Sequence, residues 1–204
     1  MKVKRVIIEG IMAHFGYGMS GKTQKTYEIP NPSTIVGIIE NLYDLDKCNS
    51  KFNFGYFIEY SGKHEDFMSI NKYTSDRKAK NDNVYYEYLN DVRLVIYTDI
   101  EKDLVIREVL RLGCAKCLGT LKEEKPIELK EGNGYTYNQL AKIGKGDGKI
   151  RTCNTLTYFD EGKGYFEYEV GQFQECIEVE GTDNLDDDFN VCVNMFEYEN
   201  GIIK

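Results

Sequence analysis

One short stretch of the chain gathers side chains that can transfer protons. His14, Lys22, Lys25 and Tyr27 lie close together in the sequence. Such groups act as general acids or bases when they come within hydrogen-bond reach of a reacting atom. The only other histidine is His64, and a lone histidine is more often structural or simply exposed. The sequence shows no carboxylate pair, Ser-His-Asp set or cluster of metal ligands. His14, Tyr27 and Lys25 are therefore the candidate catalytic group, and no metal or other cofactor is expected.

The next residues predict the start of a helix. Asn31 can cap a helix, and Pro32 suits its first turn. Apolar residues then recur at helical spacing, at Ile35, Ile38, Ile39 and Leu42. Backbone N–H groups at such a start attract anions, and the hydroxyls of Ser33 and Thr34 can add donors. Simple helix capping explains the same pattern, and the residues alone favour it.

A second candidate anion site is the glycine-rich stretch 144–149. Its exposed N–H groups, with Lys145 and Lys149 beside them, can approach a phosphate closely. It is not a Walker loop, because no Gly-Lys-Ser/Thr occurs in it. A flexible surface loop is an equal alternative.

Six cysteines are present, and only Cys114 and Cys117 form a close pair. A structural zinc site needs a second pair of cysteines or histidines at similar spacing, and the sequence has neither. The flanking residues do not predict the strand-to-helix junction of a thioredoxin-like site. We expect ordinary reduced thiols of a cytosolic protein.

The net charge of −8 argues against nucleic-acid binding, but the charge is unevenly distributed. Residues 175–200 hold nine acidic and no basic side chains, so the remainder of the chain sums to +1. Basic residues gather in 1–30, 72–80 and 142–151. Charge runs are usually solvated surface. The alternative is a molecule with basic loops for phosphates and an acidic end that faces elsewhere.

The order of predicted elements is strand, helix, strand, strand, helix, strand. Strands are predicted over 3–9, 53–60, 92–98 and 126–131, and helices from residue 32 and over about 100–112. Asp99 and Asp103 at the start of the second helix, and Arg107 and Arg111 near its end, suit the helix dipole. We therefore expect an α+β, ferredoxin-like fold, which is also the RRM-like scaffold of RNA-recognition modules. A fold of this kind does not by itself fix function.

Two segments extend this minimal fold. Residues 61–91 are too long for a simple hairpin loop and predict a thumb-like insertion that carries Arg77, Lys78 and Lys80. Strand signals after residue 150, around a turn at 160–164, predict a small C-terminal β region. We therefore expect a ferredoxin-like domain over 1–135, with the thumb at about 61–91, and a β-rich region with an acidic tail over 136–204. Residues 10–31 are expected to form a long loop.

The sequence gives no sign of export or membrane insertion. Charged residues interrupt the first apolar segment, and no run reaches the roughly 18 apolar residues that span a bilayer. A soluble, cytoplasmic protein with no membrane partner is expected.

Several motifs resemble a known family. Residues 13–15, then Thr26 to Pro30, then Pro32 to Leu42 resemble the start of the Cas-five family of type I CRISPR complexes, within the RAMP superfamily. Residues 88–94 resemble that family's entry into its third strand, and Leu118-Gly119 with 125–130 is similar to its Leu-Gly segment and last ferredoxin strand. The resemblance covers roughly residues 1–131. Asn31 interrupts the family's paired prolines, and Thr120 stands where an Arg commonly follows Leu-Gly.

The resemblance implies a non-catalytic subunit that binds the 5′ handle of a CRISPR RNA and caps the backbone of a type I Cascade interference complex. Its implied partners are the CRISPR RNA, the backbone subunit, the large subunit and target DNA near its flanking motif. For RNA contacts we expect Lys22, Lys25, Tyr27, Ser33, Thr34, Lys145 and Lys149. In the thumb, Arg77, Lys78 and Lys80 can contact RNA or the neighbouring subunit.

Two alternatives stay open. Some members of the family cut precursor RNA with His, Lys and Tyr, which here implies a metal-independent endoribonuclease using His14, Tyr27 and Lys25. The other alternative is a decoy or inhibitor that acts by protein interaction, because the acidic stretch 175–200 could mimic nucleic acid.

Overall fold

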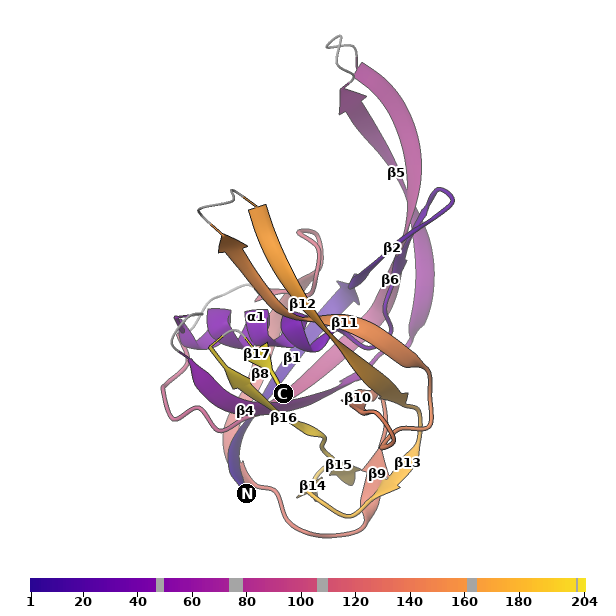
Figure 1. Ribbon diagram of the computed structural model, residues 1–204. Coiled ribbons are helices and arrows are strands. Elements are labelled where there is room, and N and C mark those ends of the chain that lie inside the picture. Colours follow the sequence, from indigo (N-terminus) through magenta and orange to yellow (C-terminus); the bar gives the residue numbers. More distant parts are fainter. Residues whose placement is uncertain (47–49, 74–78, 106–109, 161–164, 201) are drawn as a thin grey trace.

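Figure 1 shows the computed structural model, in which residues 1–46, 50–73, 79–105, 110–160, 165–200 and 202–204 are described. These residues form seventeen strands and a single helix, α1 (Pro32–Tyr43). Ten strands make a curled, largely antiparallel half-barrel. They are β1 (Lys2–Ala13), β2 (Gly16–Ser20), β3 (Thr23–Thr26), β4 (Lys51–Glu59), β5 (Gly62–Tyr73), β6 (Ala79–Thr98), β7 (Leu110–Arg111), β8 (Leu118–Glu128), β16 (Met195–Glu199) and β17 (Ile202–Ile203).

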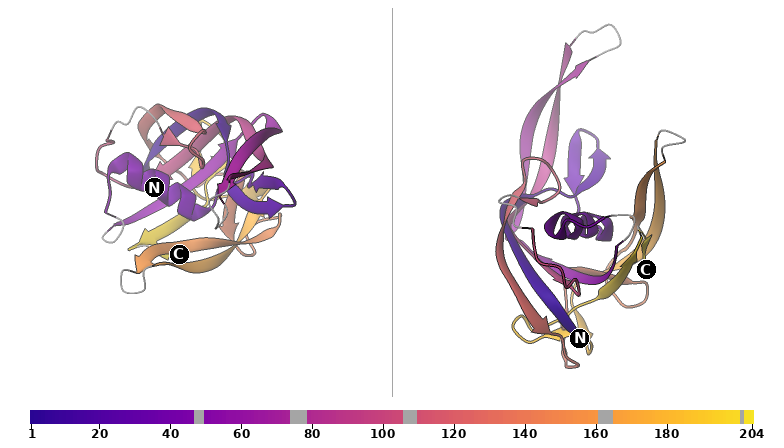
Figure 2. Two further views of the ribbon diagram at one scale, coloured as in Figure 1. Left: turned by 90° about the horizontal axis from the view of Figure 1, so that it is seen from above. Right: turned by 90° about the vertical axis from the view of Figure 1, so that its left-hand side faces the viewer.

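The main path of this sheet runs β17-β16-β4-β6-β1-β8-β7, while β3 and β5 pair with β6. Its central strands are apolar on both faces because both faces are covered. In β1, Val6 and Ile8 pack in the core that contains α1, whereas Val3 and Ile7 pack in a second core on the other side. Strand side chains point alternately to the two faces, so this division follows from the pleat. Figure 2 shows α1 lying in the hollow of the curved sheet.

Helix α1 forms where the sequence predicts it. Pro32 occupies its first turn, and its apolar residues are buried against the sheet. Asn31 makes no side-chain cap hydrogen bond, which differs from the capping role expected for it. The helix ends at Tyr43, where Asp44 adopts a left-handed conformation with φ of 48° and donates its N–H to the Glu40 carbonyl.

The predicted α+β, ferredoxin-like class is wrong, because strand accounts for 59% of the chain and helix for only 7%. The second helix expected over about 100–112 is missing from the described residues of that span. Residues 101–105 have no regular structure, Leu110–Arg111 form β7, and 106–109 lie outside the described residues. Asp99, expected at the helix start, instead accepts hydrogen bonds from the backbone N and Nδ2 of Asn53, at 2.8 and 2.7 Å. The Val105 N–H donates to the Leu42 carbonyl at 2.8 Å, so tertiary contacts outweigh the helix dipole.

A long hairpin of β5 and β6 projects from the body (Figures 1 and 2). Its pairing runs from Gly62 opposite Asn90 to Tyr73 opposite Ala79. The hairpin overlaps the expected thumb, and the C-terminal half of β6 continues into the main sheet. Residues 10–31 do not form the expected long loop, since they hold the end of β1 and the β2–β3 hairpin, which lies against β6.

The C-terminal part forms two smaller sheets and then returns to the large one. The smaller strands are β9 (Gly134–Thr136), β10 (Gln139–Lys142), β11 (Ile150–Asp160), β12 (Tyr165–Cys176), β13 (Val179–Gly181), β14 (Leu185–Asp186) and β15 (Val191–Cys192). Their orders are β10-β12-β11 and β13-β9-β15-β14. Residues 161–164, where a hairpin turn is predicted, lie outside the described residues. β16 and β17 then extend the main sheet beyond β4.

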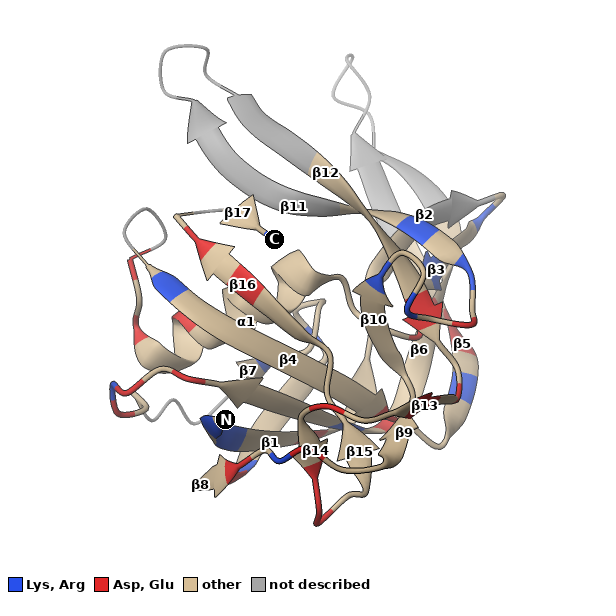
Figure 3. Ribbon diagram, turned by 60° about the horizontal axis from the view of Figure 1, so that its bottom comes forward, with Lys and Arg blue, Asp and Glu red and all other residues tan. Residues whose placement is uncertain are grey.

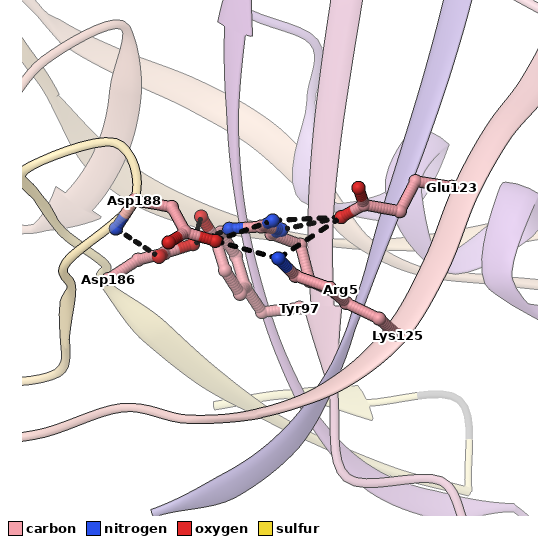
Figure 4. Close-up of polar contacts among 6 residues, drawn as sticks. All are labelled: Arg5, Tyr97, Glu123, Lys125, Asp186 and Asp188. Carbon is pink, nitrogen blue, oxygen red and sulfur yellow. Dashed lines mark hydrogen bonds and ion pairs between the residues drawn. The ribbon is translucent and has the colours of Figure 1, made fainter.

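Part of the acidic stretch 175–200 is paired with basic residues of the main sheet (Figure 4). The buried Arg5 of β1 forms an ion pair with Asp186 at 2.8 Å and another with Asp188 at 2.9 Å. The Tyr97 hydroxyl also donates to Asp186, at 2.8 Å. Much of the acidity that the sequence concentrates here is therefore neutralised within the fold. No helix in the described part of the chain has the length and apolarity needed to span a membrane.

Candidate functional site

A cleft of about 830 Å³ lies between the β2–β3 hairpin and the start of β11. Tyr17 of β2, Lys25 of β3 and Tyr27 line one side. Lys149 and Arg151 line the other side, together with the end of β12. The cleft thus joins the first basic loop of the sequence to the basic segment 142–151, which is far away along the chain.

Arg151 connects the two sides. Its guanidinium carbon lies 4.3 Å from the centre of the Tyr27 ring, and its Nη2 donates a hydrogen bond of 2.8 Å to the Ile29 carbonyl. The guanidinium is buried, and Glu175 lies 3.7 Å from its Nε. Cation–π contacts of this kind contribute about 0.5–2 kcal/mol, depending on desolvation. Arg151 therefore holds the Tyr27 segment against β11.

The backbone around Tyr27 is fixed at two further points. The Thr26 hydroxyl accepts a hydrogen bond of 2.8 Å from the Phe15 N–H, and the Tyr56 hydroxyl donates one of 2.6 Å to the Pro30 carbonyl. Burial raises the pKa of the Tyr27 hydroxyl, and the charge of Arg151 opposes that rise. The ring of Tyr17, 59% exposed, meets Tyr27 edge to face at 4.9 Å. Tyr27 is thus a fixed ring, and Tyr17 presents an aromatic surface to solvent beside it.

The charges at the cleft are mixed, and Figure 3 shows basic and acidic segments side by side near β2, β3 and β10. Lys25 pairs with Glu65 at 3.3 Å and Glu87 at 3.4 Å, and these carboxylates raise its pKa. Lys63 of β5 pairs with Glu28 at 2.6 Å. Lys149 is exposed and has no ion-pair partner among the described side chains. Lys149 is consequently the cation at this cleft that is free to meet an external anion.

The other residues predicted to bind RNA lie away from this cleft lining. Lys22 is exposed at the turn between β2 and β3, and Ser33 and Thr34 lie in the first turn of α1. Lys145 lines a separate cavity of about 540 Å³ beside β13 and β15. In the thumb, Arg77 and Lys78 lie outside the described residues, and only the backbone of Lys80, in β6, is described.

Three N–H groups of the glycine-rich loop are already bonded within the fold. The N–H of Gly148 donates to the Glu175 carbonyl at 2.8 Å, and that of Lys145 to the Lys142 carbonyl at 3.1 Å. The Gly144 N–H donates to the Gln174 side chain at 3.0 Å. A Cβ on Gly146 would lie 2.5 Å from the Glu175 carbonyl oxygen, so glycine is needed there for close packing on β12.

His14 is buried at the root of the thumb. Its Nδ1 lies 2.7 Å from the Glu87 carbonyl, and its ring packs against Tyr86 and Tyr88. Tyr27, by contrast, packs on Arg151 in the cleft. The imidazole is thus held by a backbone carbonyl and an aromatic cluster, an environment typical of a structural histidine.

The sequence interpretation identified Lys25, Tyr27 and Lys149 but missed Tyr17, Lys63 and Arg151. Arg151 belongs to the basic segment 142–151 of the sequence, and that clustering is the one signal that could have pointed to it. Its role depends on the long-range contact between β11 and residues 27–29, which no local pattern reveals.

Comparisons with known proteins find a similar fold among solved structures. No protein-family model matches the chain, and no curated protein matches it. Among solved structures, a chain of a "CRISPR RNA-guided surveillance complex" is similar, with a TM-score of 0.54 and 11% identity over 93% of this chain and 94% of that one. A CRISPR protein from Archaeoglobus fulgidus aligns over 100% and 97% of the two chains, with 10% identity and a TM-score of 0.38.

The first of these likenesses establishes a shared fold: this chain has the fold of a subunit found in a CRISPR RNA-guided complex. The sequence motifs around Thr26–Gly37 resemble the Cas-five family, and this resemblance is consistent with that fold.

Proposed function

We propose that this protein is a CRISPR-associated, non-catalytic subunit that binds the 5′ handle of a CRISPR RNA and caps the backbone of a type I Cascade complex. The observation that carries the proposal is the cleft at which Lys149 and the Tyr17–Tyr27 pair meet. The shared fold with a chain of an RNA-guided surveillance complex supports it.

The side chains of the cleft suit single-stranded RNA. Unstacked bases bind exposed aromatic rings, and phosphates bind lysines, in a manner that tolerates many sequences. Tyr17 offers the exposed ring, and Lys149 offers the unpaired amine. Lys25 is held by two carboxylates, so an RNA phosphate has to compete with Glu65 and Glu87 for it.

The same proposal assigns contacts to the remaining partners. The thumb would contact the backbone subunit, and the body would contact the large subunit close to target DNA beside its flanking motif. Such an assembly would work in the cytoplasm. The proposal also includes RNA or subunit contacts from residues outside the cleft, and each can be tested by its own substitution. These residues are Lys22, Ser33, Thr34, Lys145, Arg77, Lys78 and Lys80.

Fluorescence anisotropy with labelled CRISPR repeat RNA tests the proposal. Tyr17→Ala should weaken binding by about 1–3 kcal/mol, the usual contribution of one base–aromatic stack, while Tyr17→Phe should bind like the wild type. Tyr135→Ala is the matched control, because Tyr135 is also exposed, at 44%, but lies in β9. Equal binding by Tyr17→Ala and Tyr135→Ala would contradict the placement of RNA at this cleft. Purification of the intact complex without RNA would instead favour the decoy or inhibitor alternative.

Incubation of repeat RNA with the protein, without metal, tests the endoribonuclease alternative. We expect no cleavage, since His14 is buried against the Glu87 carbonyl and the raised pKa values of Lys25 and Tyr27 disfavour their acting as bases near neutral pH. Site-specific cleavage that His14→Ala abolishes would establish an enzyme.

A further inference from the structure

The turn between β7 and β8 brings Cys114 and Cys117 into direct contact. Their Sγ atoms lie 3.1 Å apart. Bonded sulfurs lie about 2.05 Å apart, so an approach of about 1 Å would join them. The backbone already closes the turn, because the Leu112 N–H donates to the Cys117 carbonyl at 2.7 Å and the Cys117 N–H to the Cys114 carbonyl at 3.1 Å.

The body of the protein holds this turn in place. Gly113 has a φ of +91°, and a Cβ there would lie 1.9 Å from the His14 carbonyl oxygen, so only glycine permits the approach. The His14 N–H donates to the Leu112 carbonyl at 3.1 Å. Leu112 itself is buried in the main core. The two thiols are therefore positioned by the fold rather than by chance contact of mobile side chains.

The two thiols differ in access. Cys117 is fully buried, whereas Cys114 is partly exposed and lies beside the exposed residues Ala115 and Lys116. A metal site does not account for the pair, because the described residues contain no group of three or more potential ligands. The other described cysteines, Cys153, Cys176 and Cys192, are buried singly.

We propose that Cys114 and Cys117 form a redox-active dithiol that closes reversibly to a disulfide by exchange with a low-molecular-weight disulfide such as glutathione disulfide. The Cys114 thiolate attacks one sulfur of that molecule, forms a mixed disulfide and releases one glutathione thiolate. The Cys117 thiolate then attacks the Cys114 sulfur and releases the second. Two electrons pass from the protein to glutathione disulfide, and the two thiol protons end on two glutathione molecules.

The surroundings of Cys117 affect how fast an external thiol reduces the disulfide. Burial, together with the contact to Cys114, raises the pKa of the Cys117 thiol to about 12. A thiol of high pKa is a poor leaving group, so an external thiol that attacks the exposed Cys114 sulfur displaces Cys117 slowly. The same high pKa leaves little Cys117 thiolate at neutral pH, so closure of the disulfide should be slow as well. The disulfide should consequently form on prolonged exposure to an oxidant and reopen only under sustained reduction.

Peptide mapping of the full-length protein tests the proposal directly. The protein is incubated with glutathione disulfide at neutral pH, quenched with acid, alkylated under denaturing conditions and digested with trypsin. Cleavage after Arg111, Lys116 and Lys122 places the two cysteines in separate peptides, 112–116 and 117–122. In the oxidised protein these peptides should be joined, with a mass two hydrogen atoms below the sum of the two reduced peptides, and dithiothreitol should separate them. Cys153, Cys176 and Cys192 should stay alkylated and serve as internal controls.

Single-cysteine variants separate the two steps. Cys117→Ser should stop at a glutathione adduct on Cys114, whereas Cys114→Ser should acquire no adduct at the buried Cys117. The proposal is overturned if both cysteines of the folded wild type remain fully alkylated after glutathione disulfide treatment. It is equally overturned if the two peptides become joined only after denaturation. Neither result depends on RNA binding, so this test stands apart from the proposed function.

Discussion

The Arg151 guanidinium lies 4.3 Å from the centre of the Tyr27 ring and also bonds to the Ile29 carbonyl. These contacts join a strand of the C-terminal half to the loop that precedes α1. The two residues lie far apart in the sequence, and their contact joins the two sides of the proposed RNA cleft.

Removing the charge of Arg151 should loosen the contact between the two sides of the cleft. In Arg151→Met the buried Ile29 carbonyl loses its donor, which should lower the free energy of unfolding by about 1–3 kcal/mol. RNA affinity should fall as well, because Tyr27 is no longer held. Urea unfolding and anisotropy measure the two effects, with Arg111→Met as the matched control, because Arg111 is exposed in β7 and does not line the cleft. Wild-type stability and affinity in Arg151→Met would show that the Arg151–Tyr27 contact has no such role.

Lys149 should contribute one phosphate contact. For single-stranded RNA, log K falls as log salt rises, and each lost contact makes this negative slope shallower by about 0.7. Lys149→Ala should show this change, since Lys149 is exposed at the cleft and unpaired among the described residues. Lys145→Ala is the informative comparison, because Lys145 lies on the same loop but lines the other cavity. A larger change in Lys145→Ala than in Lys149→Ala would move the RNA path to the cavity beside β13.

A local sequence pattern predicted the structure correctly where no long-range contact opposes it. The apolar spacing of Ile35, Ile38, Ile39 and Leu42 predicted α1, and all four residues are buried. The charge pattern around Asp99 predicted a second helix in the same way. There, however, the Asp99 carboxylate bonds to Asn53, and Leu110 and Leu112 pack into the main core from β7 and the residue after it. The described part of 100–112 therefore holds no second helix, and the β2–β3 hairpin replaces an expected loop, so the fold is mostly strand. A sequence interpreted one segment at a time does not reveal such contacts.

The candidate site shows the same limit. Lys25 and Tyr27 are neighbours in the sequence, so their clustering was visible. Lys63 joins them only because β5 and β3 both pair with β6. Arg151 joins them only because β11 contacts the loop before α1. Three N–H groups of the glycine-rich loop bond to β12 or to Lys142, and the contacts to β12 join segments that lie far apart in the sequence.

Breaking the buried Arg5–Asp186 ion pair should cost much more stability than breaking an exposed pair nearby. Only 3% and 4% of these two side chains are exposed. Asp186→Ala removes the most buried partner of Arg5, while Glu123 and Asp188 remain at 2.8 and 2.9 Å. The cost should therefore fall below the loss of about 3–5 kcal/mol that is typical when a buried charge loses all compensation. Asp187→Ala is the matched control, because its pair with Lys130 is exposed and worth at most about 1 kcal/mol. Urea unfolding measures both, and similar losses in the two variants would refute a structural role for the Arg5–Asp186 pair.

Acid should weaken the C-terminal edge of the main sheet through Glu199. Lys204 and Lys51 donate to its carboxylate at 2.6 and 3.0 Å and lower its pKa to about 2. An unfolded glutamate titrates near pH 4.3, so this stabilisation is fully present above about pH 5 and is lost as the pH falls through the folded pKa of about 2. Urea midpoints measured between about pH 5 and 2 should therefore fall less steeply in Glu199→Gln than in the wild type. Glu178→Gln, which removes an exposed carboxylate of the same acidic stretch, should keep the wild-type slope. An unchanged slope in Glu199→Gln would mean that the paired carboxylate does not couple folding to pH, because only a group whose pKa differs between the folded and unfolded states can do so.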